Sequence, residues 1–316
     1  MPQNVTAVAE YHFNRIVRSR VLWLLSLPIL LDGIVNVTTT QTAMQYLGNL
    51  RYIASFQRGI AICIPFACIF FGARAIAGAR GAGQLQTTVL QPVSRLDVLV
   101  GKALGQTAAL LLAISAVVFV GYLYGTVSGF RPPIPRTLGF VILSGVYAGA
   151  LTIGMIGLSA LFQRAIVPAS VAFVGGATSF LFYESIVAAP LKLLYGSASG
   201  GSPAGTDGTV LASTQPDAPL GLLALVSRLP PTNAYYAFSN WALGLPNADA
   251  LSLLIVFNLR PDSVSLGVTP LGPLFGDSGV PLYLHPMASV VTLVSISLVV
   301  FAVGYAVFKR SDLQQL

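Results

Sequence analysis

The residues that could carry catalytic or metal chemistry are few in this chain, and their spacing argues against such chemistry. The two histidines, His12 and His285, are far apart in the sequence, so they are not expected to share a zinc ion. Both cysteines lie in one apolar run and are expected to behave as small apolar residues. A phosphate-binding P-loop is missing as well, because Gly101 and Lys102 are followed by Ala103 instead of Ser or Thr. We therefore expect no catalytic residue, metal site or cofactor within this chain.

Two carboxylates in or beside apolar runs could instead mark a transport path. Asp32 lies about 11 residues after Val21, which is roughly 16 Å along a helix. An unpaired carboxylate inside a membrane costs about 2.5–3.5 kcal/mol, so Asp32 must face protein, water or the outer surface. Glu184 lies near the outer end of another apolar run. Both are candidates for the path, and the alternative for Asp32 is a carboxylate that water reaches at the end of a short span.

The elements that position such residues are predicted to be transmembrane helices. The chain has 316 residues, of which 55% are hydrophobic and only 9% are charged, against about 25% charged in a soluble domain. A helix of about 20 apolar residues crosses a bilayer core, and lipid offers an open backbone no hydrogen-bond partners. The predicted spans are Val21–Val37, about Ile60–Ala79, Val98–Tyr124, Leu138–Phe162, Ala165–Ala189 and Met287–Phe308. The sequence therefore predicts an all-α membrane protein with six transmembrane helices.

The net charge of +7 fits membrane topology better than nucleic-acid binding, because the basic residues are scattered between apolar runs. An even number of spans places both termini on one side. Among the short segments, Lys and Arg are concentrated on that side, which indicates that both termini are cytoplasmic in the cell membrane. The basic residues assigned to it are Arg15, Arg18, Arg20, Arg74, Arg80, Arg95, Lys102, Arg164, Lys309 and Arg310.

Two segments outside the spans have expected structures of their own. Residues 1–20 alternate apolar and basic side chains, which is typical of an amphipathic helix that lies along the inner leaflet. Residues 190–286 form a long extracytoplasmic loop before the last span. Within it, residues 234–243 are expected to form a short helix capped by Thr232 or Asn233.

The predicted cytoplasmic loop between the second and third spans has local signals for a shaped elbow. Gly83–Leu90 can form a short helix that ends before Pro92. Ser94 can cap the next helix, with Asp97 three residues later in the manner of a capping box. Lys102 is expected to extend toward the inner surface. These signals favour a rigid cytoplasmic element over a flexible linker.

The same loop carries a pattern of residue types at fixed spacing. Its positions are Gly83, Leu85, Pro92, Val93, Ser94, Arg95, Asp97, Val98, Gly101 and Lys102. This pattern resembles the signature of ABC-2-type exporter permeases, and the order of the predicted elements and residues 231–235 are similar to that family too. The resemblance implies one transmembrane domain over residues 1–316 with a coupling elbow at 80–97. One departure is that Ala79 and Gly81 flank Arg80, where members often carry acidic residues.

The resemblance also implies a mechanism and partners. Two permease copies would form the path through the lipid bilayer, and a separate cytoplasmic ABC ATPase subunit would bind ATP and Mg²⁺ and drive export. The residues to which coupling with the ATPase is assigned are Arg80, Gln84, Leu85, Gln91, Pro92, Ser94, Arg95 and Asp97.

Other functions remain open at this point. A self-sufficient secondary transporter or channel usually shows internal repeats and several buried ionisable groups, and in this sequence only Asp32 is expected to lie deep. A membrane anchor would not need a shaped elbow, and the loop could also be a solvated basic segment that only sets topology. No residue indicates the transported cargo.

Overall fold

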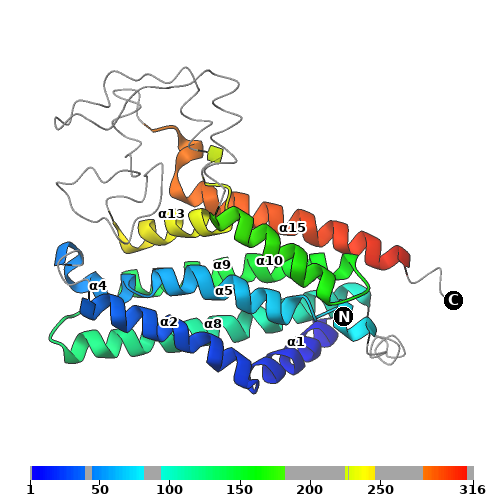
Figure 1. Cartoon of the computed structure of the whole chain (residues 1–316), viewed down its shortest axis with the longest axis horizontal. Helices are drawn as coiled ribbons and strands as arrows, with labels where there is room; N and C mark the ends of the chain where they lie inside the picture. Colours follow the sequence, from blue (N-terminus) through cyan, green and yellow to red (C-terminus); the bar gives the residue numbers. More distant parts are fainter. Residues whose placement is uncertain are drawn as a thin grey trace.

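The described part of the chain is helical. The computed structural model describes residues 2–39, 45–81, 94–181, 225–226, 228–245 and 280–311. Within these ranges every regular element is a helix, and the longest helices run roughly along the long axis of one elongated bundle (Figure 1). The predicted all-α class is confirmed for this part of the chain.

Five helical stretches are long and apolar enough to cross a membrane. They are Arg20–Thr38, Leu47–Arg80, Arg95–Val127, Ile134–Leu161 and Pro286–Arg310. They correspond to the predicted spans other than the fifth. α10 (Ile166–Leu181) is a shorter apolar helix at the start of that predicted fifth span, and residues 182–189 lie outside the described residues.

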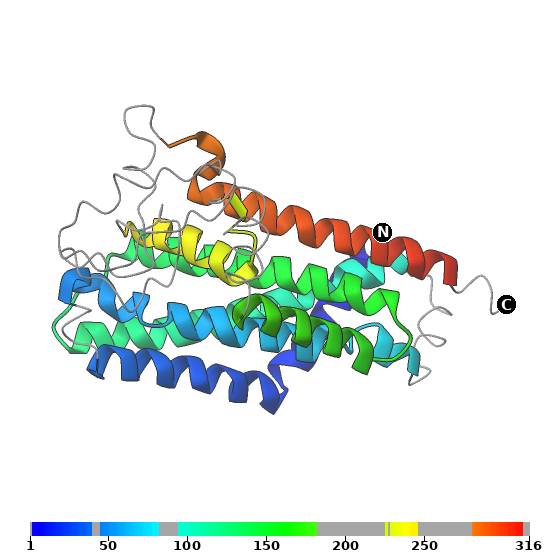
Figure 2. The ribbon, with the colours of Figure 1, turned by 45° about the horizontal axis from the view of Figure 1, so that its top comes forward.

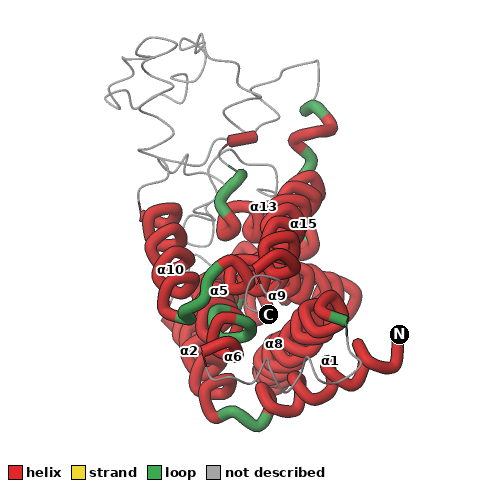
Figure 3. Tube along the Cα trace, turned by 90° about the vertical axis from the view of Figure 1, so that its right-hand side faces the viewer, coloured by secondary structure: helices red, strands yellow, loops and turns green. Residues whose placement is uncertain are grey.

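The long helices meet around α9. The elements concerned are α8 (Arg95–Val127), α9 (Ile134–Leu161) and α15 (Pro286–Ser311), while α2 (Arg20–Thr39) packs on α8. α9 packs against both α8 and α15 (Figure 3). α9 and α15 approach closely at two glycines: a Cβ on Gly157 would lie 2.5 Å from the Cα of Phe301, and a Cβ on Gly304 would collide with the Gly157 carbonyl. Small residues at such a contact let two backbones touch, which lipid-embedded helices use for association.

The second predicted span is interrupted, which corrects the expectation of one continuous helix over about Ile60–Ala79. The stretch consists of η1 (Gln45–Leu50), α4 (Arg51–Ala54), α5 (Gln57–Gly72) and α6 (Ala77–Gly81). The four residues 73–76 between α5 and α6 form turns instead of helix. Pro65 lies inside α5, and the helix continues through it.

Two ends of the bundle can be distinguished (Figures 1 and 2). The terminal end holds α1 (Pro2–Val17), α6, the first turn of α8 and the last turn of α15. The distal end holds α4 and the last turn of α8, and α13 (Pro231–Leu243) lies in the same half. The predicted N-terminal helix is therefore present and packs on α8, and its position at a membrane surface stays a prediction.

α13 occupies the region where a short helix was predicted, but the expected caps are wrong. The helix begins at Pro231 after Pro230, without a side-chain cap from Thr232 or Asn233. Proline suits the first helical position, because its fixed φ fits the helix and its missing N–H leaves no unsatisfied donor there. Gly244, with φ 69°, ends the helix in the left-handed conformation.

Candidate functional site

The start of α8 is fixed by the predicted capping box. The Asp97 N–H donates to Ser94 Oγ at 3.1 Å, and the Ser94 N–H donates to Asp97 Oδ2 at 3.3 Å. These two bonds satisfy backbone donors that the first turn would otherwise leave open. The prediction for Ser94 and Asp97 as a capping pair is confirmed, and it sets the direction in which the chain enters α8.

Arg80 and Arg95, on either side of the predicted elbow, meet at one aromatic ring. The guanidinium carbon of Arg80 lies 4.8 Å from the centre of the Phe308 ring, and that of Arg95 lies 5.7 Å from it. Phe308 belongs to the last turns of α15 and is only 2% exposed. We call Arg80, Arg95 and Phe308 the arginine junction.

The arginine junction also binds backbone carbonyls at two helix ends. Arg95 Nη1 donates to the carbonyls of Phe308 and Lys309, at 3.3 and 3.2 Å. Arg80 Nη1 donates to the carbonyl of Phe162, the residue that caps α9, at 3.3 Å. A helix leaves its last carbonyls without partners, and a cation there also complements the helix dipole. The two ends of the segment between α6 and α8 are therefore attached to α9 and α15.

The other predicted coupling residues lie in the segment between those attachments. Gln84, Leu85, Gln91 and Pro92 are outside the described residues, so their assignment stays a prediction. Lys102 differs from its expectation, because its Nζ donates to the carbonyl of Ala75 at 2.5 Å instead of extending to the surface. Sequence reasoning missed Phe308 because an aromatic residue near the end of an apolar span has no local signal for a contact with distant arginines.

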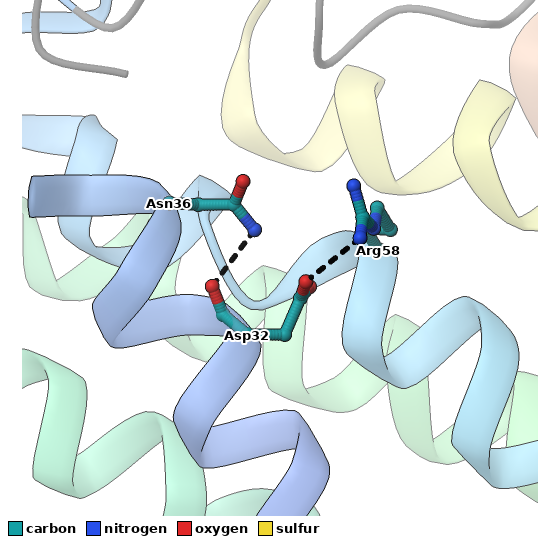
Figure 4. A network of polar contacts seen from close by, with 3 residues as sticks. All are labelled: Asp32, Asn36 and Arg58. Carbon is teal, nitrogen blue, oxygen red and sulfur yellow. Dashed lines mark hydrogen bonds and ion pairs between the residues drawn. The ribbon is translucent and has the colours of Figure 1, made fainter. Parts of the chain in front are cut away.

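Asp32, the first path candidate, is paired with Arg58 (Figure 4). Asp32 Oδ1 lies 3.2 Å from Arg58 Nη2, and the pair joins α2 to α5. The Asn36 side chain adds a hydrogen bond of 2.7 Å to the Asp32 backbone carbonyl. The insertion cost of an unpaired carboxylate therefore does not apply to Asp32. Glu184, the second candidate, lies outside the described residues.

A polar network fixes α13 to the bundle close to this ion pair. Gln57 is fully buried, and its Nε2 donates to Ser239 Oγ at 2.6 Å and to Asn240 Oδ1 at 2.7 Å. On α9, the Ser144 hydroxyl lies 2.9 Å from the Tyr235 hydroxyl. The Tyr235 ring is stacked on Tyr147 with centres 4.5 Å apart. These contacts hold α13 against α5 and α9.

A cavity of about 570 Å³ lies between α5, α9, α10 and the start of α13. Its lining is mainly apolar and includes Pro65, Phe66, Met155 and Phe173, and the hydroxyl-bearing residues in it are Ser179 and Thr232. Cavities of this size and character accommodate apolar small molecules or parts of them. Across the described ranges, no three His, Cys, Asp or Glu residues are grouped as a metal site would require.

The sequence profile of the ABC-2 family transporter proteins matches residues 6–313, which is nearly the whole chain. No curated protein matches the chain.

Proposed function

Because the chain belongs to the ABC-2 transporter family, we propose that it is the permease subunit of an ABC exporter whose ATP is hydrolysed by a separate subunit. Membership of the family indicates a multi-pass membrane protein that takes part in transmembrane transport. It also implies association with an ABC ATPase. The proposal adds that two copies form the path, and that the ATPase subunit holds ATP and Mg²⁺ and binds the elbow at residues 80–97.

The observation that carries the proposal is the attachment of this elbow to the rest of the bundle. Arg80 reaches the end of α9, and Arg95 reaches the end of α15. A force applied between these two arginines would therefore act on two of the long apolar helices at once, and a loop that only sets topology would not need such attachments.

The direction of the chain in the membrane follows from its basic residues. Arg80, Arg95, Arg164, Lys309 and Arg310 all belong to helix ends or connections at the terminal end of the bundle. Lys and Arg are enriched in the cytoplasmic connections of membrane proteins, so we place the terminal end in the cytoplasm. With α10 and the residues after it as a sixth span, both termini are then cytoplasmic.

The cavity supports a cargo with an apolar part. Most of its lining residues come from the apolar helices α5, α9 and α10, and neither Asp32 nor Arg58 is among the residues that line it. An apolar surface of this kind favours a molecule, or a portion of one, that carries no charge. Asp32 then contributes to the path indirectly, because its ion pair with Arg58 joins α2 to α5.

The proposal can be tested by site-specific photo-crosslinking in the native membrane. A benzoylphenylalanine at Leu96, which is 41% exposed in the first turn of α8, is expected to crosslink to a cytoplasmic ATPase. The matched control is the same probe at Val127, which is 87% exposed at the other end of the same helix and is expected to give no such product. An ATPase captured at Val127 but not at Leu96 would reverse the orientation, and capture at neither position would contradict the partner assignment.

A further inference from the structure

The break between α5 and α6 interrupts the helical hydrogen bonding at the end of a membrane-spanning stretch. Residues 73–76 are turns, and no Gly or Pro lies among them. Irregular backbone at membrane depth persists only where other parts of the protein satisfy its hydrogen bonds. The partners of these backbone groups are therefore part of the reason that the helix breaks at this place.

One hydroxyl on α9 satisfies three of these groups. Ser159 Oγ donates to the carbonyl of Ala73 at 2.8 Å and accepts from the N–H groups of Ile76 and Ala77 at 3.2 and 3.1 Å. A hydroxyl has one donor and two acceptor positions, so Ser159 uses all of them on the break. The side chain is fully buried. Since Ala73 caps α5 and Ala77 begins α6, Ser159 connects both sides of the break to α9.

A second side chain, from α8, binds another carbonyl in the middle of the break. Lys102 Nζ donates to Ala75 at 2.5 Å. The Ala75 carbonyl thus receives a charged donor, and such hydrogen bonds are about twice as strong as neutral ones. Together Ser159 and Lys102 hold the break from two different long helices.

We propose that Ser159 and Lys102 are positioning residues that make the α5–α6 break a rigid joint, so that α6 moves together with α9. This inference rests on the proposed function, in which an ATPase acts on the elbow that follows α6. Ser159 passes the displacement of α6 to α9, and the close contact of Gly157 with Gly304 passes it on to α15. Without the hydroxyl, the hydrogen bond of Arg80 to Phe162 would still attach α6 to α9, but the break itself would be held only by Lys102, and less of the elbow's movement would reach α9.

The first test needs no ATPase and measures spin-label distances in the purified chain in nanodiscs. Both native cysteines are replaced by alanine, and labels are placed at Ala79→Cys on α6 and Val127→Cys at the far end of α8. Ser159→Ala is expected to broaden this distance distribution. The pair Gln163→Cys and Val127→Cys, which reports on the end of α9, is expected to stay as narrow as before.

The matched control for this test is Ser144→Ala. Ser144 is also a fully buried serine on α9, but its hydroxyl contacts Tyr235 and not the break. It should leave both distributions unchanged. If Ser159→Ala leaves the Ala79–Val127 distribution narrow, or broadens both pairs equally, the rigid joint is contradicted.

The second test uses the complex that co-purifies with the tagged chain, trapped with ATP, Mg²⁺ and vanadate. In the unsubstituted joint, the labels at Ala79 and Gln163 are expected to shift together relative to Val127. In Ser159→Ala the Gln163 label should shift less than the Ala79 label, because Arg80 still attaches α6 to Phe162, and an undiminished joint shift would overturn the inference. If nothing shifts even with Ser159 present, the proposed ATPase coupling fails, while the nucleotide-free test still decides whether the joint is rigid.

Discussion

The terminal and distal ends of the bundle use polar side chains in different ways. At the terminal end, Arg80, Arg95, Lys102 and Ser159 bind backbone groups where helices stop or break. At the distal end, polar side chains also bind one another across helices, as Gln57 does with Ser239 and Asn240, although Arg136 donates to the Leu243 carbonyl at the end of α13. The terminal end is therefore built around interruptions of the backbone, which is where a moving element can be attached. The distal end also has a break, at residues 55–56 between α4 and α5, but its side-chain pairs between helices hold α13 against α5 and α9 in one arrangement.

The two tryptophans allow the two regions to be observed separately. Trp241 lies on α13, 5.7 Å from the His285 ring. Trp23 lies near the turn between α1 and α2, where its indole N–H donates to the Val17 carbonyl at 2.9 Å. The variant Trp23→Phe keeps only Trp241 and reports on the distal end. The variant Trp241→Phe keeps only Trp23 and reports on the terminal end, and the predictions below use both variants.

The largest expected effect is at the distal end, from Arg58→Ala. This change leaves Asp32, whose side chain is 20% exposed, without its charged partner. An unpaired carboxylate within a span costs up to about 3 kcal/mol. We expect a loss of thermal stability of that order, detected by Trp241 fluorescence. The double variant Asp32→Asn with Arg58→Gln should recover most of the loss because it removes both charges, and a double variant as unstable as the single one would contradict the ion pair.

A pH effect of intermediate size is expected at the terminal end, from His12. Burial lowers the pKa of His12 from 6.5 to about 4, with smaller contributions from the charges of Lys102 and Arg15. Because the folded chain disfavours the protonated imidazole, the contribution of His12 is complete above pH 6.5 and is lost as the pH falls from there toward 4. At pH 5 the loss is about 2 kcal/mol. Thermal unfolding followed by Trp23 fluorescence at pH 7 and at pH 5 should show this loss of stability.

A variant without a titratable group separates this effect from general acid sensitivity. In His12→Gln, the stability measured by Trp23 fluorescence should fall less between pH 7 and pH 5 than in the unsubstituted protein. Any fall that remains comes from other groups in the chain. An unaltered pH dependence in His12→Gln would show that other groups are responsible.

A smaller effect is expected at the arginine junction, from Phe308→Leu. Leucine keeps most of the buried apolar volume but removes the ring that lies under two guanidinium groups. Each such interaction contributes about 0.5–1 kcal/mol at partly exposed sites, so a loss of about 1–2 kcal/mol is expected. The measurement is the same spin-label distance, Ala79–Val127, together with thermal stability. Phe301→Leu, on the same helix but away from both arginines, is the control, and equal losses in the two variants would refute a special role for Phe308.

The smallest effect is expected from Ser94→Ala at the start of α8. Loss of an N-cap side chain costs about 1 kcal/mol. Ser94→Asp, which keeps a side-chain acceptor, should retain stability in the same thermal melt. If Ser94→Ala is as stable as the unsubstituted protein, the capping box does not contribute to holding the first turn of α8.

The sequence predicted those parts of the fold that depend on local signals. The long apolar helices followed from the length of apolar runs, and the capping box followed from Ser94 and Asp97, three residues apart. The break at residues 73–76 could not be predicted in the same way. Ser159, whose hydroxyl binds the backbone of the break, lies 83 residues from Ile76 in sequence, and a serine in an apolar helix gives no signal of its own.

The candidate site was predicted only in part for the same reason. Arg80 and Arg95 were selected by their place in a motif, but the contact of Arg95 with the end of α15 spans 213 residues of sequence. The partner of Asp32 was likewise missed, because nothing in either apolar run indicates that Arg58 faces α2. Long-range pairing of polar groups is decided by how the helices pack.

The contact between Gly157 and Gly304 has a consequence for the order of biosynthesis. A chain is made from its N-terminus at about 5–20 residues per second, so α9 leaves the ribosome roughly ten seconds before α15 does. During that interval α15 does not yet cover the surface over Gly157, and the arginine junction lacks its aromatic ring. The nascent protein thus completes its assembly only when its last long helix arrives.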